Sequence, residues 1–281
     1  MIARPAAVFD SGVGGLSVAR EIRHALPSEH LLYFADTAFC PYGDRTLHEV
    51  RARTLSAARH LESRGAKALV VACNTASGAA LELLRETLSI PVIGLEPALK
   101  PAVAASRNGR VGVMATSGTV RSDRFRRLVE NYAGDRHVVA QPCPGLADMV
   151  EDGLLEGDAL AARLDELTEP LRAAGVDTVV LGCTHYVFVR DAIARALGPG
   201  VELVDSGPAI ARQTRRVLAE RGMLEEAGEG SIRFLTTGDP RDVGPVMERL
   251  WGAPLVAEHV DVPTAELPEA WRTPPPAAAA R

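Results

Sequence analysis

The chain has 281 residues, enough for one large domain or two of ordinary size. Its net charge of −5 gives no general attraction for nucleic acid, and no basic block lies among aromatic residues as in a nucleic-acid-binding surface. No apolar run reaches the roughly 18 residues that a membrane span needs, so we expect neither nucleic acid nor membrane as a partner.

Short apolar runs alternate with helical stretches along the first third of the chain. The runs predict strands at 5–9, 31–35, 67–72 and 90–93. Helices are predicted between them, at 16–26, 46–63 and 76–87, and another begins at 96–97. Thr46, with Glu49 three residues later, has the pattern of a capping box at the start of the second helix.

The rest of the chain repeats this scheme. Strands are predicted at 110–114, 137–140, 177–181 and 201–204. Helices are predicted at 119–132, 145–151 and 159–174, and from Pro208 onward. One further strand at 232–235 and a helix reaching 251 follow. Residues 271–281 are rich in Pro and Ala, and we expect this tail to be disordered.

The alternation predicts an α/β fold with mainly parallel sheets flanked by helices. The two halves also overlay, because residues 8–12 match 114–118 at an offset of 106 and Cys73 matches Cys183 at an offset of 110. Chance similarity between strand ends is the alternative. Two similar lobes would share one cleft, since ligands of open α/β sheets bind beyond the carboxyl ends of the strands.

Two thiols stand out because each directly follows a predicted strand. Cys73 ends the run at 68–72, and Cys183 ends the run at 178–182. A buried cysteine is ordinarily a small apolar residue, and we assign Cys40 and Cys143 that structural role. A helix start is predicted after Cys73 and after Cys183, and a helix N-terminus lowers the pKa of a thiol.

Paired thiols in one cleft fit the inversion of a stereocentre. Removal of an amino-acid Cα proton needs a base on one face and an acid on the other, and two thiols can exchange these roles. A free thiol titrates near 8.5, so a modest shift makes it useful at neutral pH. Lys67 and Lys100 are the two lysines of the chain, which disfavours a pyridoxal cofactor because that cofactor needs a lysine.

Several residues beside the strand ends can poise a thiol or hold a substrate. Asp10 and His185 can do either, although a helix cap and a structural histidine are the ordinary alternatives. The glycines of segment 10–15 match no nucleotide-binding motif and favour contact between backbone N–H groups and a carboxylate. Residues 41–43 form a turn whose backbone can line the cleft. Composition alone makes Glu151 a surface carboxylate.

These segments, taken together, resemble the glutamate racemases of the cofactor-independent aspartate/glutamate racemase superfamily. The matching stretches run in family order over roughly residues 5–260, at 9–16, 41–43, 72–76, 115–116 and 182–186. The resemblance implies two pseudosymmetric lobes with the active site between them. The first lobe would comprise 1–96, completed by 207–270, and the second 97–206.

The resemblance also implies an activity and a set of roles. The enzyme would interconvert L- and D-glutamate for peptidoglycan, with Cys73 acting on the D-isomer and Cys183 on the L-isomer. Asp10, His185 and Glu151 would assist catalysis, although the residues before Glu151 are less typical of the family. Substrate would be held by Asp10, Ser11, Pro41, Tyr42, Gly43, Asn74, Thr75, Thr116, Thr119, Thr184 and His185. No cofactor or metal is implied, and a homodimer is expected.

The start of the chain lacks the charged and apolar regions of a secretion signal, and its four cysteines are widely spaced. We therefore expect a cytoplasmic protein with free thiols. Cys40 lies where many relatives carry another residue, so a place near the cleft is also open to it.

Three alternatives remain at this stage. A sister racemase could act on aspartate or a hydantoin, since one methylene changes binding by only about 1–3 kcal/mol. Cys73, Cys183 and His185 could instead form a zinc site, although their spacing is wide for one. A binding protein of the same fold could have lost catalysis, but its two thiols argue against that.

Overall fold

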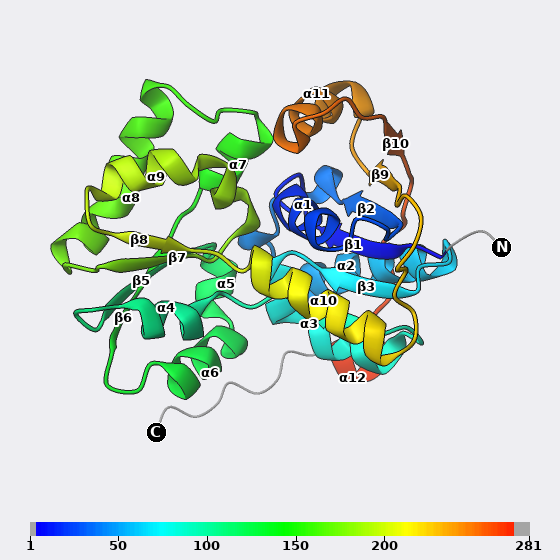
Figure 1. Cartoon of the computed structure of the whole chain (residues 1–281), viewed down its shortest axis with the longest axis horizontal. Coiled ribbons are helices and arrows are strands. Elements are labelled where there is room, and N and C mark those ends of the chain that lie inside the picture. Colours follow the sequence, from blue (N-terminus) through cyan, green and yellow to red (C-terminus); the bar gives the residue numbers. More distant parts are fainter. Residues whose placement is uncertain (1–3, 273–281) are drawn as a thin grey trace.

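The computed structural model describes residues 4–272, which form two parallel β-sheets flanked by helices (Figure 1). The predicted α/β class is confirmed. The first sheet has the order β10-β9-β2-β1-β3-β4, with β1 (Ala6–Asp10), β2 (Leu31–Ala35), β3 (Ala68–Val71), β4 (Val92–Gly94), β9 (Ile232–Thr236) and β10 (Ala257–His259). The second has the order β6-β5-β7-β8, with β5 (Arg110–Ala115), β6 (His137–Pro142), β7 (Thr178–Leu181) and β8 (Glu202–Val204).

Twelve α-helices lie within the described residues. In chain order they are α1 (Leu16–Ala25), α2 (Leu47–Ser63), α3 (Asn74–Thr87), α4 (Leu99–Ala105), α5 (Ser117–Arg121), α6 (Asp123–Tyr132), α7 (Leu146–Glu151), α8 (Asp158–Ala173), α9 (Arg190–Leu197), α10 (Gly207–Glu220), α11 (Pro240–Trp251) and α12 (Glu269–Arg272). Shorter 3₁₀ helices are η1 (Thr37–Phe39), η2 (Tyr42–Asp44) and η3 (Thr184–Val189). The predicted capping box is present, since Thr46 and Glu49 bond reciprocally at the start of α2.

The two sheets repeat one strand order, because β2-β1-β3-β4 corresponds to β6-β5-β7-β8. Their registers also correspond. Phe9 pairs with Val71, and Met114 pairs with Leu181. The structural counterpart of Ser11 is therefore Thr116, one residue away from the sequence overlay. Every strand pair is parallel, so the ends of the central strands β1, β3, β5 and β7 can carry one shared site.

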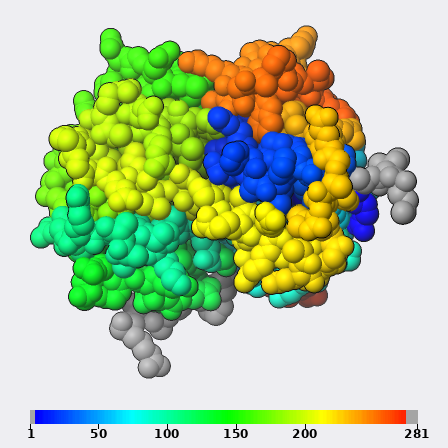
Figure 2. All heavy atoms as spheres, viewed as in Figure 1, coloured from blue at the N-terminus to red at the C-terminus, as the bar shows by residue number. Residues whose placement is uncertain are grey.

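After β8 the chain returns to the first sheet, which β9 and β10 extend. Helix α10 packs against α1 on this return path. In Figure 2 the green and yellow-green segments form one half of the molecule, and the blue, yellow and orange segments form the other. The lobe limits at 96–97 and 206–207 remain a prediction.

The core is mainly aliphatic, although Phe9, Tyr33 and Phe34 are also fully buried in it. Strands β1, β2 and β3 are buried at every position, as expected for parallel sheets covered on both faces. One apolar cluster contains Val8 and Ile22 of the first half together with Leu181 and Ile193 of the second. Packing therefore continues from one sheet to the other.

Several details differ from the sequence predictions. The predicted helix at 119–132 is broken into α5 and α6 at Ser122, whose hydroxyl caps the second helix by accepting the N–H of Phe125 at 3.1 Å. Strand β10 was not predicted. The expectation of disorder is wrong for Trp271 and Arg272, which lie in α12, while 273–281 lie outside the described residues.

Trp271 is held by two contacts. Its indole N–H donates to a Glu86 carboxylate oxygen at 3.0 Å, and the Arg51 guanidinium lies 4.9 Å from the ring centre. These contacts attach α12 to α2 and α3. Over residues 4–272 no helix is both long and apolar enough to cross a membrane.

Candidate active site

The predicted site residues gather at the carboxyl ends of the central strands. Asp10 is the last residue of β1, Cys73 follows β3, Thr116 follows β5 and Cys183 follows β7. Two of them begin helices directly, because Cys73 is the N-cap of α3 and Thr116 is the N-cap of α5. This arrangement agrees with the sequence prediction that these segments lie beyond the carboxyl ends of the strands.

Cys73 is buried beside the first β-strand. Its Sγ accepts the N–H of Ala76 at 3.4 Å and lies 3.6 Å from the Ser11 hydroxyl. Burial, with a smaller contribution from the Asp10 carboxylate, raises the pKa of Cys73 to about 12. The N–H of Ala76 at the start of α3 lowers this pKa as expected, but desolvation of the thiolate outweighs it, so the net shift is upward.

Cys183 has a different environment. The element after it is the 3₁₀ helix η3 and not an α-helix, and its Sγ lies 3.5 Å from Nδ1 of His185. The other ring nitrogen, Nε2, lies 2.5 Å from Oε1 of Glu151. Burial alone lowers the pKa of His185, but Cys183, Cys40 and Glu151 together raise it well above its ordinary value. Cys183 thus has an imidazole neighbour that Cys73 lacks.

Glu151 closes α7 and points inward. Its Oε1 accepts the N–H of Val13 at 2.7 Å as well as contacting His185. The two partners are distant in sequence, so the local pattern could not reveal them. The composition-based expectation of a surface carboxylate is wrong, and Glu151 joins the second lobe to the loop after β1.

Asp10 connects the neighbourhoods of the two thiols. One carboxylate oxygen accepts the N–H of Ser11 at 2.7 Å, and the other accepts the hydroxyl of Thr184 at 3.0 Å. Burial raises the pKa of Asp10, and His185 opposes that rise. A Cβ on Gly15 would lie 2.5 Å from the Asp10 Cβ, so glycine is needed there for close approach.

Three threonine hydroxyls form a cluster between the lobes. Oγ1 of Thr75 lies 2.8 Å from Oγ1 of Thr116 and 3.3 Å from that of Thr119. Thr116 and Thr119 are themselves 3.0 Å apart. Gly43 packs against this cluster, since a Cβ there would lie 2.9 Å from the Thr116 Cβ. Hydroxyls grouped this way can donate together to a carboxylate.

Asn74 has an unused acceptor. Within residues 4–272 its buried Oδ1 finds no hydrogen-bond partner. Asn74 also lines a cavity of about 50 Å³ together with Cys183 and Thr184. Because buried polar atoms are nearly always paired, this oxygen marks a place for a donor such as an ammonium group.

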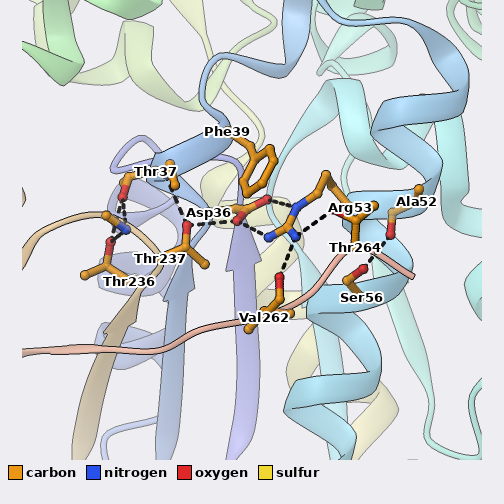
Figure 3. Close-up of polar contacts among 12 residues, drawn as sticks. Asp36, Thr37, Phe39, Ala52, Arg53, Ser56, Thr236, Thr237, Val262 and Thr264 are labelled. Carbon is orange, nitrogen blue, oxygen red and sulfur yellow. Dashed lines mark hydrogen bonds and ion pairs between the residues drawn. The ribbon is translucent and has the colours of Figure 1, made fainter. Parts of the chain in front are cut away.

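The predicted turn at 41–43 is held by a buried network. The hydroxyl of Tyr42 donates to Asp36 at 2.5 Å, and the Arg53 guanidinium donates to both Asp36 oxygens at 3.0 and 2.7 Å. Figure 3 shows Arg53 also reaching the carbonyl of Val262 and the hydroxyl of Thr264. The Tyr42 hydroxyl is thus already bonded to Asp36. The turn can therefore contact a ligand through its backbone.

Sequence reasoning missed Asp36 and Arg53. Their partners lie as far as 211 residues away, and a charged pair at a strand end and in a helix carries no local signal. Ser17 was also missed, although its hydroxyl donates to the Thr184 carbonyl at 3.1 Å and so joins the lobes.

The two remaining cysteines, Cys40 and Cys143, lie in different environments. Cys143 is buried, and its thiol donates to the Gln141 carbonyl at 3.3 Å, as a structural residue would. Cys40 lies in the site, where it forms with Glu151 and His185 the group of three candidate metal ligands found within residues 4–272. Cys73 and Cys183 are not members of that group, so the zinc alternative built on them finds no support in the geometry.

Comparison with known proteins identifies the family. Residues 14–214 match the family model described as Asp/Glu/Hydantoin racemase. The chain belongs to this family. A glutamate racemase of Stutzerimonas stutzeri is 48% identical over 257 residues, covering 91% of this chain and 97% of that protein.

Solved structures of other family members have the same fold. A glutamate racemase isoform from Bacillus anthracis superposes with a TM-score of 0.86 at 35% identity, covering 93% of this chain and 99% of that one. The Escherichia coli glutamate racemase, in complex with L-glutamate and the activator UDP-MurNAc-ala, gives 0.82 at 34% identity, covering 92% and 99%. The two-sheet architecture is therefore that of the racemase family.

Proposed function

We propose that the chain is a glutamate racemase that interconverts L- and D-glutamate without a cofactor by proton transfer between two cysteines. The observation that carries the proposal is the equivalent position of Cys73 and Cys183. Cys73 follows β3 and Cys183 follows β7, and these strands occupy corresponding places in the two sheets. Family membership and the names of the similar proteins support the same activity.

In the proposed reaction the substrate loses one proton from Cα and gains one proton at the same carbon. A thiolate on one side of the substrate takes the Cα proton, and the electron pair stays on the substrate as a carbanion. The opposite thiol gives its proton to the other face of that carbon. The product is the mirror image, and the two cysteines have exchanged protonation states. Cys73 would be the base for D-glutamate and Cys183 the base for L-glutamate.

Polar groups around the thiols suit an amino acid with two carboxylates. The threonine cluster of Thr75, Thr116 and Thr119 would bind one carboxylate, and backbone N–H groups after β1 would assist. The free oxygen of Asn74 and the carboxylate of Asp10 would accept from the ammonium group. Ser11, Thr184 and the backbone of 41–43 would complete the pocket, with His185 and Glu151 assisting the transfer at Cys183.

The cellular setting is part of the proposal. We infer a cytoplasmic homodimer that supplies D-glutamate for peptidoglycan. The support is the resemblance of the site segments to glutamate racemases. Size-exclusion chromatography with light scattering measures the oligomeric state directly, and a monomer at micromolar concentration would contradict that part alone.

The experiment for the activity uses purified chain and D-glutamate with no added cofactor. Circular dichroism should decay to zero as the L-isomer forms. Aspartate and a hydantoin, assayed in parallel, test the rival substrates, and we expect glutamate to be preferred. Binding of glutamate without decay of the signal would support a binding protein instead.

A further inference from the structure

Cys40 belongs to a cluster that the proposed reaction does not use. Its Sγ, a carboxylate oxygen of Glu151 and a ring nitrogen of His185 all lie within 4.8 Å of one another. The three side chains come from separate segments, namely the turn before η2, the end of α7 and η3. Thiol, carboxylate and imidazole are together the ligand set of a zinc site.

The backbone leaves room for this convergence. A Cβ on Gly12 would lie 1.9 Å from Oε1 of Glu151 and 2.7 Å from Sγ of Cys40. The absence of a side chain at Gly12 therefore lets both ligand atoms approach the same point. Cys40 is half-buried and the Glu151 side chain is 16% exposed, so the cluster is not sealed from solvent.

We propose that Cys40, Glu151 and His185 bind a soft divalent cation such as Zn²⁺ and that its binding stops turnover. Zinc bonds of about 2.0–2.3 Å in a tetrahedral site place ligand atoms roughly 3.3–3.6 Å apart. Nε2 of His185 and Oε1 of Glu151, now at 2.5 Å, would separate by about 1 Å. As the metal–ligand bonds form, the Cys40 thiol loses its proton to solvent, and so does Nε2 of His185, whose proton now lies in the hydrogen bond to Glu151. Three protein ligands leave the fourth position for water or a substrate atom.

The metal would inhibit turnover because two of its ligands, His185 and Glu151, assist the transfer at Cys183 in the proposed function. It would occupy the His185 nitrogen opposite the one that faces Cys183 at 3.5 Å, and it would compete with the Val13 N–H for Glu151. The arrangement beside Cys183 would then be fixed by the metal. This consequence rests on the proposed function, whereas the binding itself does not.

The test uses Co²⁺ as a spectroscopic substitute for Zn²⁺ on the purified full chain. Thiolate coordination to Co²⁺ gives a near-ultraviolet charge-transfer band, and Zn²⁺ should displace it with one metal per chain. The matched variants are Cys40→Ser, Cys40→His, Cys73→Ser and Cys183→Ser. Circular dichroism melting verifies that each is folded.

We expect Cys40→Ser to lose the band and to weaken Zn²⁺ binding at least about tenfold, a loss that removal of even an outer partner of a metal ligand can cause. Cys40→His should keep metal binding without the band, and Cys73→Ser and Cys183→Ser should keep both. The racemase activity of Cys40→Ser, compared with its own metal-free rate, should resist Zn²⁺. An unchanged band in Cys40→Ser, its loss in Cys73→Ser or Cys183→Ser, or no saturable binding by the parent would overturn the metal site. If the site binds metal but glutamate is not racemised, the proposed function alone has failed.

Discussion

The two thiols have unlike surroundings although their strand positions correspond. Cys73 is held by Ser11 and the Ala76 N–H, whereas Cys183 lies beside His185, which in turn contacts Glu151. The sequence indicated the pairing of the thiols. It could not reveal the asymmetry, because Glu151 reaches the site from a helix whose local pattern is that of a surface helix.

The division of labour between the thiols gives a first prediction. In D₂O, Cys183→Ser should still exchange the Cα proton of D-glutamate through Cys73, and Cys73→Ser should exchange that of L-glutamate through Cys183. Each variant should lose at least about a hundredfold in racemisation, the lower range for removing a positioned acid or base. Proton NMR of the Cα signal measures the exchange, and the opposite enantiomer preference would contradict the assignment.

Cys143 gives a prediction for stability against pH. Burial raises the pKa of this thiol to about 12, while an unfolded thiol titrates near 8.5. The folded state keeps the proton between these pH values and the unfolded state loses it. The stability from the neutral thiol is therefore complete below about pH 8.5 and is lost as the pH rises toward 12.

Replacing Cys143 should make the free energy of unfolding fall less steeply as the pH rises. In Cys143→Ala the free energy of unfolding should fall less steeply above pH 8.5 than in the parent, by up to about 1.4 kcal/mol per pH unit. Urea unfolding at intervals from pH 7 to 10 measures both slopes. Parallel slopes would show that Cys143 does not keep its proton in the folded state.

At the scale of elements, periodicity predicted most strands and helices because the buried strands are continuous apolar runs. The helix at 119–132 was predicted as one, since Ser122 interrupts no apolar periodicity, although its hydroxyl bonds both the end of α5 and the start of α6. The turn at 41–43 was located correctly, but the hydroxyl of Tyr42 has a structural partner that no local pattern discloses.

The turn at 41–43 should depend on that partner. Tyr42→Phe removes a hydrogen bond to the buried carboxylate of Asp36, which is worth about 1.5–3 kcal/mol for a charged acceptor. We expect that loss in the free energy of unfolding and a higher KM for glutamate. Tyr132→Phe, at a tyrosine that is 40% exposed, is the matched control and should change neither. Equal effects of the two substitutions would contradict the role of the Tyr42–Asp36 hydrogen bond in holding the turn.

At the scale of the molecule, the duplication visible in the sequence corresponds to two sheets with one strand order. Repeated strand ends such as those before Cys73 and Cys183 were enough to predict two lobes and one cleft. The strand pairing was needed to show that Ser11, and not Asp10, is the structural equivalent of Thr116. The joining contacts, from Ser17 to Thr184 and from Val13 to Glu151, arise only when the two lobes come together.

In the proposed mechanism, two groups on opposite faces of the substrate invert its Cα. The most direct measurement follows D-glutamate turnover in D₂O and analyses both enantiomers at low conversion by chiral separation and mass spectrometry. Transfer between two thiols should give L-glutamate that carries one deuteron at Cα, while the remaining D-glutamate keeps its proton. L-glutamate that retains the original Cα proton would contradict the two-thiol mechanism.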